Sequence, residues 1–197
     1  MIGRDFWYDV LRSGAILGVA MAVSHILEQY LLLYSSLSLA SVSVWYSLEW
    51  LLAAILFVWL LVRFSKRRAS AADPKYGYSY SLALSYILMV SMLTGIIVGA
   101  ANTIFIGAMG YGDYVEGMVG RVEEIRDLYH SMNIATLDAN FNAFIEALRA
   151  AEQPTMLSNV FTSFNNYILT GGLPGLIIAG VVSRKPQLFN TEDKNNE

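Results

Sequence analysis

The chain has 197 residues, of which 55% are hydrophobic and only 15% are charged, and its formal net charge is −3. Soluble domains usually carry about a quarter charged residues, so this composition indicates an integral membrane protein. It excludes a soluble enzyme, a nucleic-acid-binding protein and a secreted disulfide scaffold. The sequence contains no cysteine, which excludes disulfides, thiolate metal sites and cysteine nucleophiles.

Four apolar runs are long enough to cross a bilayer, which requires about 20 helical residues. They cover residues 6–34, 44–64, 79–109 and 157–182. Aromatic residues cluster at the ends of these runs, where membrane proteins carry an aromatic belt. The first run is longer than the apolar core of a signal peptide, so we expect it to be retained as a membrane helix. The sequence therefore predicts an all-α integral membrane protein, with residues 1–197 forming one membrane domain.

The distribution of basic residues predicts the orientation of the spans. Ten of the 13 lysines and arginines lie around the start of the first span, at the end of the second, or after the fourth. They are Arg4, Arg12, Arg63, Lys66, Arg67, Arg68, Lys75, Arg184, Lys185 and Lys194. Because cytoplasmic loops carry an excess of Lys and Arg, we expect both termini of this multi-pass protein to be cytoplasmic. Residues 186–197 then form a flexible cytoplasmic tail.

The segment between the third and fourth spans, residues 110–156, is acidic, with eight carboxylates against three arginines. Apolar residues recur in it at helical spacing in two groups. The groups are Val115, Val119, Val122, Ile125 and Tyr129, and then Leu137, Phe141, Phe144, Ile145 and Leu148. We therefore predict a two-helix extracytoplasmic cap. Such a cap could pack on its own membrane domain, dock a protein partner through residues 113–152, or cover an outer cavity as a flap.

Three stretches of the sequence carry a resemblance to a known family. The first span opens with aromatic residues at 6–8 and continues as Leu-Arg-Ser-Gly-Ala-Ile-Leu-Gly at 11–18. The third span is entered through Tyr-Gly-Tyr-Ser-Tyr-Ser-Leu-Ala-Leu at 76–84, and the fourth ends in Gly-Leu-Ile-Ile-Ala-Gly-Val-Val-Ser-Arg-Lys-Pro at 175–186 and then Phe189. In this order they resemble the bacterial four-span membrane proteins of domain-of-unknown-function family 4199. The resemblance implies four helices and an inner-membrane location, and it implies no known activity and no catalytic residue.

Two pairs of glycines predict faces on which helices pack. Gly14 and Gly18 in the first span, and Gly95 and Gly99 in the third, have the four-residue spacing that lets helix backbones approach closely. Each pair shares its helix face with polar residues. We expect these faces to point toward the other helices or toward a second copy of the chain.

Polar side chains form a candidate intramembrane site in the outer half of the spans. His25, Glu28, Glu49, Asn102 and Asn166 are predicted at a similar depth. A carboxylate in hydrocarbon is costly unless it shares a proton, binds a cation or reaches water, and a histidine one turn away could relay a proton. One interpretation is a ligand or ion site. The other is a structural polar cluster that ties the helices together.

The fourth span contains a predicted kink. Gly171, Gly172 and Pro174 lie within it, and proline removes a helical hydrogen bond. Broken helices line the substrate sites of transporters, but simple proline kinks are also common in membrane helices.

The sequence contains no catalytic constellation, so we expect a protein that is not an enzyme and has no cofactor or metal. The first hypothesis is a scaffold or accessory subunit for a partner in envelope assembly. The alternative is a small proton- or cation-coupled transporter or channel that acts as a homo-oligomer and uses Glu28, Glu49 and His25. A membrane enzyme is the third and least supported class.

Overall fold

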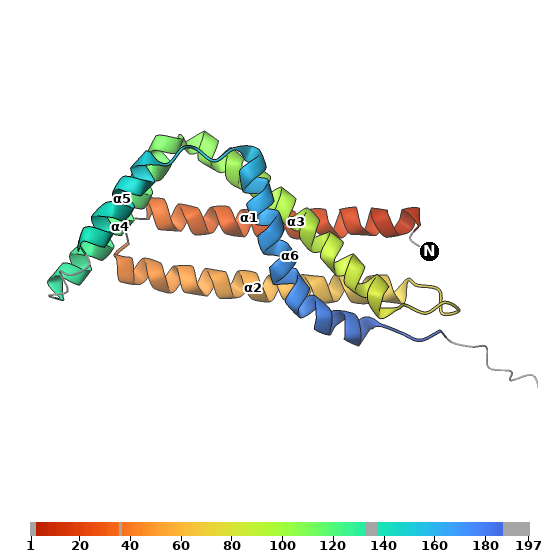
Figure 1. Cartoon of the computed structure of the whole chain (residues 1–197). Helices are drawn as coiled ribbons and strands as arrows, with labels where there is room; N and C mark the ends of the chain where they lie inside the picture. Colours follow the sequence, from red (N-terminus) through yellow and green to blue (C-terminus); the bar gives the residue numbers. More distant parts are fainter. Residues whose placement is uncertain (1–2, 36, 133–137, 187–197) are drawn as a thin grey trace, which may run out of the picture.

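The structure, a computed structural model, describes residues 3–35, 37–132 and 138–186. Six α-helices and no strand occupy these residues, which confirms the all-α prediction (Figure 1). The helices are α1 (Arg4–Tyr34), α2 (Leu39–Ser70), α3 (Tyr80–Met109), α4 (Tyr111–Ser131), α5 (Asp138–Ala150) and α6 (Met156–Val182). Leu137 and all but the first residue of the predicted tail 186–197 lie outside the described residues.

Four of the helices, α1, α2, α3 and α6, are long and apolar enough to cross a membrane. This confirms the four predicted spans. Helix α2 is longer than the predicted 44–64, since it begins at Leu39 and ends at Ser70. Hydropathy ended the prediction at the first basic residues, but Lys and Arg are good helix formers. Their long side chains also reach water from the end of a span, so the helix continues beyond the hydrocarbon.

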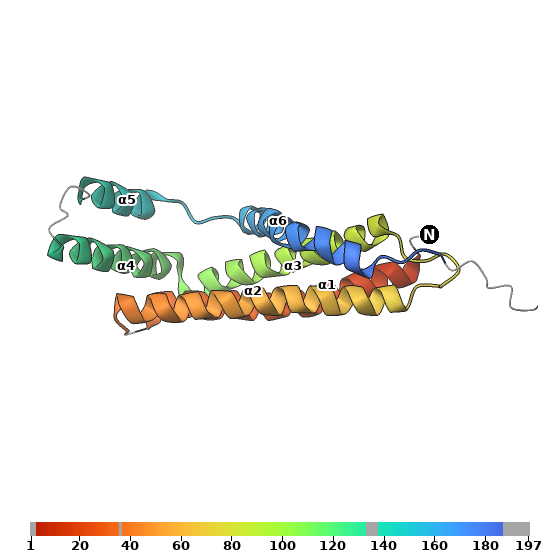
Figure 2. The same ribbon diagram turned by 90° about the horizontal axis from the view of Figure 1, so that it is seen from below.

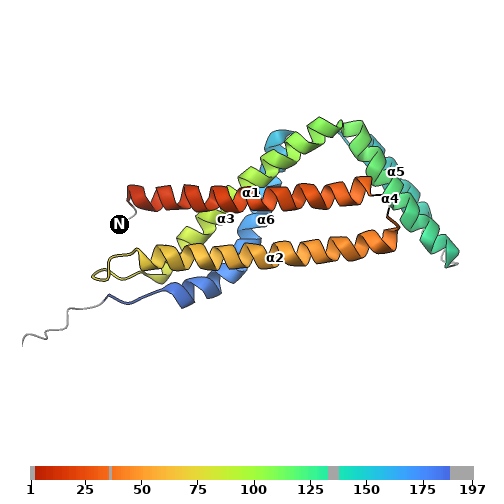
Figure 3. The same ribbon diagram turned by 180° about the vertical axis from the view of Figure 1, so that it is seen from behind.

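The two ends of the molecule differ in the segments that they contain. The N-terminal end of α1, the loop between α2 and α3 and the C-terminal end of α6 lie together at one end, while the α4–α5 hairpin lies at the other (Figures 1 and 3). At the first end, the N–H of Tyr78 donates to the carbonyl of Arg184 at 2.9 Å, and the N–H of Arg184 donates back at 2.8 Å. The basic segments therefore share one end, and the acidic hairpin occupies the other.

Helices α3 and α6 pack backbone against backbone through the second predicted glycine pair. A Cβ atom on Gly95 would lie 2.7 Å from Cα of Phe164, and one on Gly99 would lie 2.5 Å from Cα of Val160. Real Cβ atoms do not approach other atoms so closely. Only glycine therefore fits at these two positions of α3.

The first glycine pair brings α1 against α3. A Cβ atom on Gly14 would lie 2.7 Å from the Leu93 side chain, and one on Gly18 would lie 2.6 Å from the Ile97 side chain. These neighbours are side chains, which can rotate, whereas the neighbours of the α3 glycines are backbone atoms. Both glycine pairs thus lie at helix interfaces within one chain.

Helix α6 runs as one helix through Pro174 and changes direction along its length (Figures 1 and 3). Gly171 has a second role, because a Cβ atom there would lie 2.0 Å from Oγ of Ser91 on α3. Gly172 has only ordinary van der Waals space around it, with Leu88 3.7 Å from its ideal Cβ position. The glycines near the proline thus include one that permits close packing against α3.

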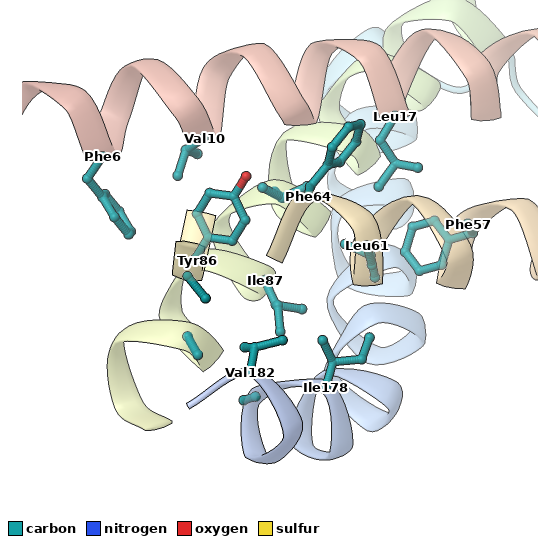
Figure 4. Close-up of a cluster of buried hydrophobic side chains, with 14 of the residues drawn as sticks. Phe6, Val10, Leu17, Phe57, Leu61, Phe64, Tyr86, Ile87, Ile178 and Val182 are labelled. Carbon is teal, nitrogen blue, oxygen red and sulfur yellow. The ribbon is translucent and has the colours of Figure 1, made fainter. Parts of the chain in front are cut away.

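The apolar core lies where α1, α2, α3 and α6 meet, toward the basic end (Figure 4). Its labelled members are Phe6, Val10, Leu17, Phe57, Leu61, Phe64, Tyr86, Ile87, Ile178 and Val182. These side chains come from the N-terminal halves of α1 and α3 and the C-terminal halves of α2 and α6. The cap-side half of the spans is left to the polar residues described next.

Candidate functional site: a polar cavity beneath the cap

Helices α1 and α3 bring four polar side chains into one hydrogen-bonded group. His25 Nδ1 lies 3.2 Å from Glu28 Oε2, and the amide nitrogen of Gln29 lies 2.8 Å from both His25 Nε2 and Asn102 Oδ1. An amide nitrogen only donates, so His25 Nε2 accepts from Gln29. A proton on Nδ1 is then donated to Glu28.

Helix α2 adds the second carboxylate. The Ser24 hydroxyl donates to Glu49, and Tyr46 lies beside Glu28. Within the described residues, no lysine or arginine forms an ion pair with either glutamate. The structure therefore places His25, Glu28 and Glu49 near one another, and the group carries net negative charge while both carboxylates are ionised.

Asn166 does not join this group, contrary to the prediction. Its side chain is exposed on α6, and no described residue forms a hydrogen bond with it. The amide that α6 directs toward α3 belongs to Asn159, which donates to the Thr103 hydroxyl at 3.0 Å. The side of α6 that faces α3 is set by the close contacts of the α3 glycines, and this turns Asn166 outward.

A cavity of about 190 Å³ lies beside the polar group and beneath α4. Its lining residues are His25, Glu28, Gln29, Leu32, Leu33, Tyr46, Tyr114 and Met118. Asn102 contributes to the group through Gln29 without lining the cavity. Sequence reasoning missed Tyr46, Tyr114 and Met118. The last two come from the cap, and no periodicity in the sequence indicates which span a cap helix covers.

Helix α4 is seated on the end of α1 above this cavity. A Cβ atom on Gly117 would lie 3.2 Å from the Leu33 side chain, so glycine lets α4 settle closely on α1. Burial raises the pKa of Tyr114, so its hydroxyl stays protonated at neutral pH. The cap thus contributes a neutral aromatic wall to the cavity.

One arginine fastens α4 to the loop after α1. Arg121 is 8% exposed. Its Nε donates to the carbonyl of Leu32 at 2.6 Å, and its Nη2 donates to the carbonyl of Ser35 at 2.6 Å. Its Nη1 pairs with Glu124 at 2.8 Å. Because a guanidinium presents several donors in a fixed plane, it can satisfy carbonyls and a carboxylate at once.

The hairpin of α4 and α5 has its own small core. Its buried members are Val119, Val122 and Ile145. At its edge Arg149 pairs with Glu116 at 3.2 Å, and this hydrogen bond raises the pKa of Arg149. Phe144, one of the apolar residues that recur at helical spacing, is 52% exposed. The prediction of two helices in this segment is confirmed.

A second polar network, which sequence reasoning missed, lies at the opposite end. Asp9 on α1 pairs with Arg67 at 3.0 Å and with Arg68 at 3.8 Å on α2. The Tyr86 hydroxyl donates to Ser13 Oγ at 2.8 Å. The sequence did contain an indication of this network. Asp9 lies near the start of the first span, at the same end of the molecule as the basic residues that follow the second span. This network joins three helices, and its charged side chains pair with one another.

Among the described residues, Glu28 therefore lines open space with a histidine, and with no lysine or arginine, as its ion-pair partner. The acceptor groups of this cavity suit a proton or a cation. The described residues contain no group of three or more His, Asp and Glu side chains that could hold a metal ion. A monovalent cation or a proton is the chemistry that this arrangement can accommodate.

The comparisons with known proteins identify a family for the chain. A family model described as "Protein of unknown function (DUF4199)" matches residues 12–184. Neither the search of curated proteins nor the search of solved structures finds a match. Since the matched segment covers most of the chain, the protein belongs to the DUF4199 family of proteins of unknown function.

Proposed function

We propose that the chain is a non-enzymatic scaffold or accessory subunit of the bacterial inner membrane, which holds a protein partner of envelope assembly against its cap. The main support for this proposal is the way in which α5 is attached to the rest of the chain. Among the described helices, α5 packs only against α4. Figure 2 shows it on the side of α4 away from α2. The cap therefore presents one helix face that the described residues leave uncovered.

The uncovered face of α5 is suited to another helix. Ala143, Ala147 and Ala150 are exposed, and Phe144 stands beside them. Small side chains reduce the distance at which two helices can pack. A large aromatic side chain in such a surface is the usual kind of interface anchor. These features favour a helical segment as the bound part of the partner.

The charge of the cap favours a basic partner. Each arginine of the cap already has an acceptor within it: Arg121 pairs with Glu124, Arg149 with Glu116, and Arg126 with Asp127. Exposed carboxylates therefore dominate the outer surface. Complementary charge steers association and discriminates between partners. The partner segment that we expect is thus both helical and rich in lysine or arginine.

The two ends of the molecule support the orientation that this role needs. Basic segments gather at one end and the acidic hairpin at the other. An excess of Lys and Arg is typical of the cytoplasmic side. On this basis the cap stands outside the cytoplasm, where envelope-assembly proteins expose their domains.

Photo-crosslinking tests the docking surface. A photo-reactive phenylalanine analogue at position 144 is expected to give one discrete protein adduct in native membranes, mapped to a basic helical segment. The adduct should weaken as salt rises toward about 1 M, where the screening length falls to roughly 3 Å. Ala147→Trp should abolish it by blocking close approach, whereas Ala151→Trp, beyond the end of α5, should leave it intact.

The analogue at Leu52, an exposed position on α2, serves as the control for unspecific capture. The same adduct from positions 52 and 144 would contradict the proposal. So would an adduct at position 144 that Ala147→Trp does not change.

A second candidate function, a proton- or cation-coupled transporter, is favoured by the cavity that Glu28 and His25 line. Flux into vesicles that is lost in Glu28→Gln and kept in Glu146→Gln would support it. Against it, the described spans are closed toward the basic end by the core around Leu17, Phe57 and Ile87. A path through one chain would have to open this packed interior, so the scaffold role is better supported.

A further inference from the structure

Asn166 presents an exposed amide deep within a membrane span. Helix α6 has 27 residues, and Asn166 lies ten residues after its first, Met156, which is about 15 Å along the helix axis. No described residue forms a hydrogen bond with its side chain. Lipid tails cannot supply one, and an unsatisfied polar group in hydrocarbon costs free energy. A helix from outside the described chain could satisfy this amide.

The exposed side of α6 has a regular pattern around this residue. Six exposed positions follow one another at alternating spacings of four and three residues. They are Thr162, Asn166, Leu169, Leu173, Leu176 and Gly180. We name this row the α6 seam. An average spacing of 3.5 residues is the repeat of two helices that coil around each other, and the α6 seam keeps it over nearly the whole span.

The α6 seam lies opposite the face that packs inside the chain. Gly171, Gly175 and Ile178 are buried toward the core, and at 100° per residue they point away from Asn166 and Leu173. Leucine 173 is 73% exposed. A Cβ atom on Gly180 would meet nothing within 4 Å. A second helix can therefore approach the seam without displacing any part of this chain.

We propose that the α6 seam pairs with the α6 seam of a second copy of the chain, in parallel orientation. An amide carries both donors and an acceptor, so two Asn166 side chains related by a twofold axis can satisfy each other. Two copies inserted in the same direction are related by such an axis along the membrane normal. A single asparagine in a helix seam is a known device for fixing register and a two-stranded state. The leucines of the seam could pack equally well against lipid tails. The Asn166 amide, which needs a hydrogen-bond partner, therefore favours a second copy of the chain over lipid.

This inference goes beyond the proposed function, because it concerns the lipid-facing side of α6 and not the cap. The two proposals can fail separately. A dimer through α6 would also place two caps on one assembly and double the surface offered to a partner.

Cysteine crosslinking in membranes tests the pairing, and the chain offers a clean background because it has no native cysteine. Leu173→Cys on the seam is expected to form a disulfide-linked dimer under mild oxidation at a low protein-to-lipid ratio. Val181→Cys is equally exposed, at 71%, but lies off the seam on the same helix. It is expected to remain monomeric.

The role of the amide is tested by adding Asn166→Leu to the Leu173→Cys chain. Crosslinking should fall by about threefold or more, as the loss of an interhelical polar contact in a membrane allows. Asn165→Leu is the matched control, because the Asn165 amide already donates to the carbonyl of Phe161 on its own helix. Equal crosslinking at positions 173 and 181, or unchanged crosslinking with Asn166→Leu, would overturn the proposal.

Discussion

Gly99→Ala is expected to lower the free energy of unfolding by about 1–3 kcal/mol, the range for adding a methyl group to a well-packed interior. The new Cβ atom would lie 2.5 Å from Cα of Val160 and 2.7 Å from the carbonyl oxygen of Asn159. Both atoms belong to the α6 backbone, which cannot rotate away as a side chain can. Unfolding in mixed detergent micelles, followed by tryptophan fluorescence, measures the loss.

Gly107→Ala is the matched control, because it lies on the same helix and no atom lies within 4 Å of its ideal Cβ position. Without a clash, alanine should stabilise the helix by roughly 0.5–1 kcal/mol relative to glycine. Gly14→Ala should fall between the two, because it meets the Leu93 side chain and not backbone. Equal stabilities of the Gly99→Ala and Gly107→Ala chains would contradict the close packing of α3 and α6.

Arg121→Met is expected to detach the cap while leaving the four spans folded. It removes the donors to the carbonyls of Leu32 and Ser35 and leaves these acceptors unpaired, at a cost on the order of 3 kcal/mol. Since the described contacts of α5 are with α4 alone, the whole hairpin should loosen together. Hydrogen exchange in α4 and α5 should accelerate, and exchange in α3 and α6 should stay unchanged.

Arg126→Met is the control for this change, since Arg126 is partly exposed and its described partners, Asn142 and Asp127, lie within the cap. It should leave exchange in α4 near that of the original chain. Arg121→Lys should behave more like Arg121→Met than like the original, because an ammonium group cannot reproduce the planar fork. Slow exchange in α4 of the Arg121→Met chain would show that Arg121 does not hold the cap.

Hydropathy and periodicity were sufficient to predict the helices of this protein. The four spans and the two cap helices occur where apolar runs and 3.6-residue patterns indicated. Helix α2 extends past the C-terminal end of the predicted span 44–64, because lysine and arginine can end an apolar run without ending the helix. The side of the membrane on which the cap stands stays a prediction from charge.

Only the contacts between residues of the same helix could be predicted for the candidate site, because these contacts follow from spacing along the helix. His25 and Glu28 are one turn apart on α1, so their contact follows from helix geometry. Asn166 was misplaced because its depth, but not its direction, can be read from sequence. The direction of each side chain on α6 depends on which face fits the α3 glycines. For the same reason, nothing in the sequence places Tyr114 of α4 over the cavity.

The proposed docking surface depends on the side of the membrane that the cap faces, and single-cysteine labelling measures this side directly. Ala139→Cys lies on an exposed position of α5, and Ala71→Cys lies in the exposed loop after α2. In spheroplasts treated with a membrane-impermeant maleimide, Ala139→Cys is expected to react at once. Ala71→Cys should react only after permeabilisation. The reverse pattern would place the cap in the cytoplasm and contradict an extracytoplasmic docking surface.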